Sequence, residues 1–139
     1  KPNNSITRAE FTSILVKAFQ LDKQDGHVFT DTKSHWAEEV ISTAASYGIV
    51  SGYSDEVFGP NDNITREQMA VMVMRAAGLE PVAEKLSFAD SESIAGWARE
   101  AIAAAVKNGI ISGYPDNSFR PQGKATRAEA ATVIAKALR

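Results

Sequence analysis

The stretch Ile6-Thr7-Arg8-Ala9-Glu10-Phe11 decides how this chain is organised, because it occurs three times. The second copy is Ile64-Thr65-Arg66-Glu67-Gln68-Met69, and the third is Ala125-Thr126-Arg127-Ala128-Glu129-Ala130. Each copy predicts a helix that begins with a capping box, in which the Thr hydroxyl accepts the backbone N–H three residues on and the Glu or Gln there returns to the N–H of the Thr. In each copy, the residue before the Thr and the residue four positions after it are spaced to form a hydrophobic staple. The staple is strong in the first two copies and weak in the third.

The arginine after each Thr (Arg8, Arg66 and Arg127) occupies the first helical position. The helix dipole is positive there, so a cation is mildly unfavourable. A helix N-terminus with an arginine beside it is suited to holding a carboxylate or a phosphate. The alternative is that each arginine pairs with an acidic neighbour or lies in solvent. Because the arginine recurs three times, anion recognition is favoured.

Composition narrows the class of protein. With 139 residues, 44% of them hydrophobic and 23% charged, the chain can form one globular domain with a sizeable core. The net charge of −2 and the lack of a basic cluster argue against nucleic acid as a partner, and no apolar stretch is long enough to span a membrane. The absence of Cys excludes disulfides and thiolate metal sites but leaves the compartment open. The opening Lys1-Pro2-Asn3-Asn4 is not a signal peptide, and we expect a segment of a larger protein.

Apolar periodicity predicts five helices. Three follow the motifs, over residues 7–20, 65–77 and 126–138. The other two open at Trp36 and Trp97 and end at Gly48 and Gly109. The segments 49–60 and 110–121 read as short extended pieces around a turn. The expected core positions on the helices are Phe11, Ile14, Leu15, Ala18, Phe19, Trp36, Val40, Ile41, Ala44, Met69, Met72, Val73, Ala76, Trp97, Ala101, Ile102, Ala105, Ala130, Val133, Ile134, Ala137 and Leu138.

The spacing of these elements shows an internal repeat of about 60 residues. Trp36 lies 30 residues before Arg66, and Trp97 lies 30 residues before Arg127. Upstream the spacing varies, because Phe29 to Trp36 is 7 residues and Phe88 to Trp97 is 9. The Trp helix, the Gly-Tyr turn and the Arg helix are therefore expected to form one geometric unit.

The repeat resembles the S-layer homology domain over nearly the whole chain. In one repeat the matching residues are Phe29-x-Asp31, Trp36-Ala37, Gly48-Ile49, Gly52-Tyr53, Phe58-x-Pro60 and Ile64-Thr65-Arg66. In the next they are Phe88-x-Asp90, Trp97-Ala98, Gly109-Ile110, Gly113-Tyr114, Phe119-x-Pro121 and Thr126-Arg127-Ala128-Glu129. Such domains usually occur as three tandem repeats at one end of bacterial surface proteins.

The resemblance implies a mainly α fold, in which three motif helices form a central bundle and helix-loop-helix prongs with short extended segments project around a pseudo-threefold axis. We expect one domain built of a partial first repeat (1–21, the motif helix only), a second repeat (27–79) and a third (86–139). Because the first repeat lacks its Trp and Gly-Tyr parts, at most two grooves between repeats should be fully built. The second motif departs from the pattern at Glu67 and Gln68.

The function implied is non-covalent anchoring to the bacterial cell wall, outside the cell, with peptidoglycan-linked secondary cell-wall polysaccharide as the partner. A sugar bearing ketal-linked pyruvate would give the arginines a carboxylate to bind by a forked hydrogen bond. The expected glycan-binding residues are Arg8, Arg66, Arg127, Thr7, Thr65, Thr126, Trp36, Trp97, Gly52, Gly113, Tyr53, Tyr114, Asp55 and Asp116. No cofactor, metal site or membrane insertion is expected.

Each of these residue types also has a structural explanation. The Thr residues are explained as caps, and core packing is about twice as favoured as sugar stacking for the two Trp. Gly52 and Gly113 are explained by backbone geometry, and Asp55 and Asp116 by turns. For Tyr53 and Tyr114, core packing and sugar contact are equally favoured. His27 and His35 lack metal-ligand spacing and are expected at the surface. The Met group at 69, 72 and 74 is expected in the bundle core.

Two other function classes compete with anchoring. A glycosidase needs two positioned carboxylates, and Gln68 breaks the Glu10 and Glu129 series, so no enzyme activity is expected. A surface-lattice module would instead use the repeats for self-association. Replacing the arginines should separate these hypotheses, because a glycan anchor would lose binding and a lattice module would change its self-association.

Overall fold

The computed structural model describes residues 4–83 and 85–138, so Lys1, Pro2, Asn3 and the last residue of the expected third repeat lie outside it. Five α-helices are present in the described ranges: α1 (Arg8–Ala18), α2 (Glu38–Ser46), α3 (Arg66–Ala77), α4 (Gly96–Lys107) and α5 (Arg127–Ala137). Two short 3-10 turns, Thr30–Thr32 and Ser91–Ser93, precede α2 and α4. The fold is mainly α, as predicted. The expected extended pieces at 49–60 and 110–121 are loops, and the β pairing of the described residues is confined to isolated bridges.

The capping boxes explain where α1, α3 and α5 begin. The hydroxyls of Thr7, Thr65 and Thr126 accept the backbone N–H three residues on, at 3.0, 3.2 and 3.1 Å. The side chains of Glu10, Gln68 and Glu129 accept the N–H of the same Thr residues in return. All three predicted capping boxes are therefore confirmed, and the hydroxyls that sequence offered to a ligand are committed to helix ends.

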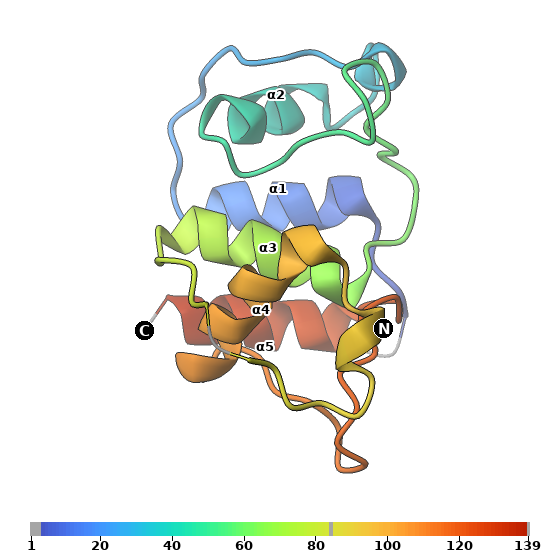
Figure 1. The fold of residues 1–139 in the computed structure, drawn as a ribbon. Coiled ribbons are helices and arrows are strands. Elements are labelled where there is room, and N and C mark those ends of the chain that lie inside the picture. Colours follow the sequence, from blue (N-terminus) through green and yellow to red (C-terminus); the bar gives the residue numbers. More distant parts are fainter. Residues whose placement is uncertain (1–3, 84, 139) are drawn as a thin grey trace.

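The three motif helices form the centre of the molecule (Figure 1). α1, α3 and α5 contact one another in every pairing, whereas α2 packs on α1 and α4 packs on α3. The residues before the three Thr caps join the motifs in a closed ring, in which Ile6 N–H donates to the Ala125 carbonyl, Ala125 N–H to Ile64 and Ile64 N–H to Ile6, at 3.2, 3.0 and 2.9 Å. The central bundle is thus present, and pseudo-threefold symmetry of the whole stays a prediction.

The core fills the space between these helices and the loops that follow α2 and α4. Its largest fully buried side chains include Phe11, Phe58, Phe119, Ile64 and Met69. The three methionines are buried, as the sequence predicted. No helix in the described ranges is both long enough and apolar enough to cross a membrane.

The prediction that the tryptophans pack in the core is wrong. Trp36 and Trp97 are 65% and 61% exposed. The next residue in each case, Ala37 or Ala98, is fully buried and takes the inward position. Trp36 also precedes α2, which begins only at Glu38.

Two further residues expected in the core are exposed, Ile14 and Leu138. Leu138 is the C-cap of α5, beyond the last helical turn. Ile14 has on α1 the register position that Met72 has on α3. Met72 is buried at the pocket that it lines together with the loop after α2, whereas Ile14 is 40% exposed.

Candidate functional site

Arg8 extends from the start of α1 to the loop that follows α2. Its Nε donates to the Phe58 carbonyl at 3.0 Å and its Nη2 to the Ser51 carbonyl at 3.2 Å. The guanidinium carbon lies 4.8 Å from the centre of the Tyr53 ring and 4.5 Å from that of Phe58. Only 5% of Arg8 is exposed. The arginine therefore fixes the Gly-Tyr turn to the bundle through charge-assisted hydrogen bonds and cation–π contacts.

Arg66 repeats this arrangement one repeat later. Its Nε donates to the Phe119 carbonyl at 2.8 Å and its Nη2 to the Ser112 carbonyl at 3.0 Å. Its guanidinium lies 4.7 Å from the Tyr114 ring centre and 4.9 Å from that of Phe119. The arginine after the cap thus stabilises a loop that is distant in the sequence. Its hydrogen bonds and ring contacts with that loop offset the unfavourable interaction of its charge with the helix dipole.

The loops that follow α2 and α4 are each stabilised by an aspartate that precedes the same helix. Asp31 accepts the N–H groups of Phe58 and Gly59, both at 2.9 Å. Asp90 accepts those of Phe119 and Arg120, both at 2.8 Å. Burial acts to raise the pKa of Asp90, but these backbone N–H donors outweigh it and hold the pKa below its ordinary value. The Asp of each Phe-x-Asp motif therefore shapes the Phe-x-Pro segment.

Gly52 and Gly113 are required by close packing and not by a special backbone angle. Neither has a positive φ. A Cβ at Gly52 would lie 2.4 Å from the Phe29 ring, and one at Gly113 would lie 2.5 Å from the Phe88 ring. The expected role in backbone conformation is corrected accordingly, because any side chain here would push the turn off the aromatic ring beneath it.

Two of the three motif arginines also form ion pairs within the protein. Nη1 of Arg66 binds Oε2 of Glu129, and Nη2 of Arg127 binds Oε2 of Glu10 at 2.5 Å. In both glutamates the other oxygen accepts the N–H of the capping Thr. These two arginines therefore follow the simpler explanation, in which each pairs with an acidic neighbour.

Arg8 differs, because it forms no ion pair within residues 4–83 and 85–138. Burial lowers its pKa from the ordinary value, while Tyr53, Asp62 and Asp31 act in the opposite direction. Arginine remains protonated at neutral pH despite such shifts. A buried positive charge thus lies near the start of α1 without a carboxylate bound to it.

The helix N-termini themselves offer fewer donors than the sequence suggested. The N–H of Arg8 donates to the Asp62 carbonyl, that of Ala9 to Pro60 and that of Glu10 to the Thr7 hydroxyl. At α3 the same three N–H positions are also occupied, by Gly123, Pro121 and Thr65. An anion at these sites must therefore be held by side chains, because the first-turn N–H groups already have partners.

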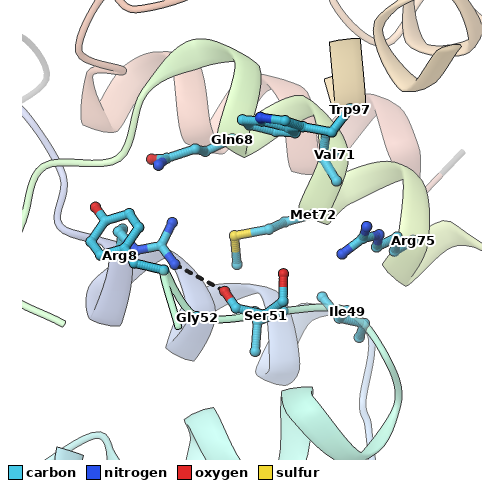
Figure 2. A pocket seen from close by; sticks show the side chains of 11 residues that line it. Arg8, Ile49, Ser51, Gly52, Gln68, Val71, Met72, Arg75 and Trp97 are labelled. Atoms are coloured by element: carbon cyan, nitrogen blue, oxygen red, sulfur yellow. Dashed lines mark hydrogen bonds between the residues drawn. The ribbon is translucent and has the colours of Figure 1, made fainter. Parts of the chain in front are cut away.

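A pocket of about 370 Å³ opens between the loop after α2 and the outer face of α3 (Figure 2). α3 contributes residues spaced i, i+3, i+4 and i+7, which share one helical face. Figure 2 shows Arg8 and Arg75 on opposite sides of Met72, with the Trp97 ring beside Gln68 and Val71. The lining residues are Arg8, Ile49, Val50, Ser51, Gly52, Tyr53, Gln68, Val71, Met72, Arg75 and Trp97.

The chemistry of this pocket is cationic and amphipathic. Two arginines line it, and no Asp or Glu is among its lining residues. Buried aliphatic side chains form its floor, and the exposed Trp97 ring forms one wall. Such a site suits an anionic ligand that also presents an apolar face.

The structure brings four of the predicted site residues together in this pocket, namely Arg8, Gly52, Tyr53 and Trp97. The others lie elsewhere. Thr7, Thr65 and Thr126 cap helices, and Arg66, Gly113 and Tyr114 lie at the equivalent position of the next repeat. Asp116 binds Ser118 and Arg120 within its own exposed turn, and the Asp55 carbonyl faces the His27 ring. Trp36 and Arg127 lie outside the pocket lining.

Sequence reasoning missed several lining residues, chiefly Gln68, Arg75 and Ser51. Gln68 was noted only as a neutral cap, and Met72 was assigned to the core. The available signal was the helical face of α3, where Gln68 and Arg75 flank the apolar Val71 and Met72. The second departure of that motif, Glu67, is explained by its hydrogen bonds to Ala95 N–H and Gln122.

Among the described residues, three kinds of element meet only at this pocket, which we call the Arg8 groove. It has a motif arginine, a Gly-Tyr turn and a tryptophan from the following helix. The Arg66 position has the turn but no following tryptophan, and the Trp36 side of α1 has no turn over it. The sequence allowed at most two such grooves, and among the described residues all three elements line the pocket beside Arg8.

Comparison with known proteins places these features in context. Residues 28–70 and 87–131 match the family described as "S-layer homology domain". The chain is 40% identical over 96% of its length to an amylopullulanase of Thermoanaerobacterium thermosulfurigenes, of which it spans 8%. It is 36% identical over 99% of its length to the cellulosome-anchoring protein of Acetivibrio thermocellus, of which it spans 33%.

A surface-layer 125 kDa protein of Lysinibacillus sphaericus is 30% identical over 99% of the chain, which spans 12% of that protein. The chain therefore covers a small part of each of these relatives. The same segment occurs in enzymes and in proteins named for anchoring and surface layers. What these proteins share with the chain is thus not the catalytic part of the enzymes.

Proposed function

The chain belongs to the S-layer homology family, whose members anchor proteins at the bacterial cell surface, and we propose that it does so by holding an acidic wall polysaccharide in the pocket beside Arg8. The protein is extracellular and associated with the cell wall. The proposed partner is secondary cell-wall polysaccharide linked to peptidoglycan, with a pyruvylated sugar as the bound unit.

The observation that carries this proposal is the pairing of charge and apolar surface in one pocket. Arg8 and Arg75 supply positive charge from opposite sides, and the pocket lining has no carboxylate to neutralise them. A ketal-linked pyruvate presents one fixed carboxylate next to a methyl group. The carboxylate fits the guanidinium side, and the methyl group fits the aliphatic floor.

The sugar ring would use the other parts of the site. Trp97 is exposed and stands at the wall, where its flat face can cover the C–H side of a sugar. Tyr53 and the backbone of Ser51 and Gly52 provide polar groups at the opposite rim. In this proposal the division into repeats 1–21, 27–79 and 86–139 is kept, and the glycan lies between the second and third repeats.

Calorimetric titration with purified wall polysaccharide tests this function. The native polymer should bind, and polymer from which pyruvate has been removed should not, because the carboxylate is lost. Equal binding of both forms would contradict carboxylate recognition, and binding of neither would contradict a glycan anchor.

A pair of matched variants locates the site. Arg75 on α3 and Lys136 on α5 occupy the same helical register, and Arg75 is exposed while Lys136 is partly exposed. Arg75→Gln should weaken binding about three- to tenfold, because an exposed cation contributes modestly. Lys136→Gln should leave the affinity unchanged. An equal loss in the two variants would indicate non-specific attraction by positive charge.

A further inference from the structure

We infer that Gln68 determines which of the three Thr-Arg motifs binds the anion, because it leaves Arg8 free to do so while the glutamates at the equivalent positions neutralise their arginines. This inference rests on the proposed function and concerns specificity among the motifs. In this inference Gln68 caps its helix and also leaves an arginine available to a ligand, whereas Glu10 and Glu129 cap their helices and bind an arginine.

The hydrogen bonds of Gln68 fix which end of its amide faces the arginine. Its Oε1 accepts the backbone N–H of Thr65 at 3.0 Å, as a cap must. The remaining group of the amide is the NH2, which can only donate. It therefore cannot accept a hydrogen bond from Arg8. Both Gln68 and Arg8 line the pocket, and Figure 2 shows the two side chains on the same side of it.

Arg8 has a matching unused donor. Its Nε and Nη2 donate to loop carbonyls, and no hydrogen bond of Nη1 to any described residue is formed. At Arg66, Nε and Nη2 donate to the equivalent carbonyls of the next repeat, and Nη1 binds Glu129. Nη1 of Arg8 is thus the atom that would hold a carboxylate, and none of the described residues supplies one.

The two glutamates show what a carboxylate at this position does. In Glu129 and Glu10, one oxygen caps the helix and the other binds the arginine of a neighbouring motif. Replacing that second oxygen by an NH2 group converts an occupied acceptor site into two convergent donors. A ligand carboxylate can bridge such donors, with Arg8 providing the charge.

The surroundings agree with this assignment. The Arg8 groove also has Trp97 at its wall, and its lining contains no acid. At Arg66 the Tyr114 hydroxyl donates to Glu129 at 3.3 Å, which further commits that carboxylate to the protein. Glu129 therefore closes the Arg66 position to an anion by charge, and none of the described tryptophans is bound there.

Exchanging the two caps tests the inference. Gln68→Glu gives the Arg8 site a carboxylate of its own, and Glu129→Gln is the matched change at the other site. Both variants keep a capping box, because Glu and Gln each form one in this protein. Thermal unfolding checks that both remain folded. Binding of native wall polysaccharide is followed by the fluorescence of Trp97 in a Trp36→Phe background, since Trp36 lies outside the pocket lining.

Gln68→Glu should raise the dissociation constant at least about tenfold, whereas Glu129→Gln should leave it unchanged. If the unaltered chain binds and Gln68→Glu binds equally well, the inference is overturned and the proposed function stands. If both exchanges weaken binding to the same extent, the inference is again overturned. Failure of the unaltered chain to bind would overturn the proposed function and this inference with it.

Discussion

The Arg8 and Arg66 sites are built from the same parts and differ in what neutralises the arginine. In both, Nε and Nη2 hold the carbonyls of a Gly-Tyr turn, and two aromatic rings lie against the guanidinium. Arg66 then binds Glu129, whereas Arg8 faces a pocket with Gln68. The charge of Arg66 is therefore paired within the protein, whereas Nη1 of Arg8 has no hydrogen-bond partner among the described residues.

This difference separates the structural task of the motif from its binding task. Holding the Gly-Tyr turn uses only two of the three guanidinium nitrogens, so it is met in both repeats. In the proposed function, binding an anion uses the third nitrogen, a second donor and a wall, and these coincide only in the Arg8 groove of the described chain. On this proposal, the repeated motif is structural at both positions and binds a ligand at only one of them.

The largest expected effect concerns the stability of the two sites. Arg66→Met should lower the free energy of unfolding by about 4 kcal/mol, because it leaves two carbonyls and a partly buried Glu129 without their partner. Arg8→Met should cost about 1 kcal/mol less, since no carboxylate loses its partner. Urea unfolding followed by circular dichroism measures both. Equal losses would show that Glu129 adds nothing to the Arg66 site.

A smaller effect distinguishes the two tryptophans. Trp97→Ala should raise the dissociation constant for native wall polysaccharide about tenfold, or about 1.4 kcal/mol, because the wall of the pocket is removed. Trp36→Ala should not change it. Both side chains are mostly exposed, so neither change should greatly alter stability. The titration would count against the assigned groove if Trp36→Ala weakened binding as much as Trp97→Ala.

The smallest effect concerns acid stability. The pKa of Asp90 is below its ordinary value of 3.8, so the unfolded chain takes up the proton at higher pH than the folded chain. Its contribution is complete above about pH 4 and is lost as pH falls through the folded pKa. Asp90→Asn should cost about 1 kcal/mol at pH 7 and flatten the decline of stability below pH 4. Urea unfolding at a series of pH values measures this, and an unchanged slope would contradict it.

The pattern of the sequence was sufficient for the helices, whereas the extended pieces expected at 49–60 and 110–121 are loops. The three capping boxes, the five helices and the burial of Phe11 and Met69 follow from local rules, because cap spacing and helical periodicity act over a few residues. The family could also be predicted, since the Gly-Tyr and Thr-Arg motifs recur in a fixed order. Trp36 and Trp97 were misplaced, because periodicity alone does not tell an inward Ala from the outward aromatic residue beside it.

The sequence by itself determined where the helices begin and that the chain is a repeat, and it predicted which residue types would meet an acidic sugar. Only the tertiary structure decided that Arg8 and Arg66 are buried supports of distant loops, with 43 to 53 residues between the partners. It also decided that Glu129 and Glu10 neutralise arginines of other motifs and that Gln68 does not. The physical reason is that counter-ions and pocket walls are set by contacts between elements far apart in the chain, which local spacing cannot specify.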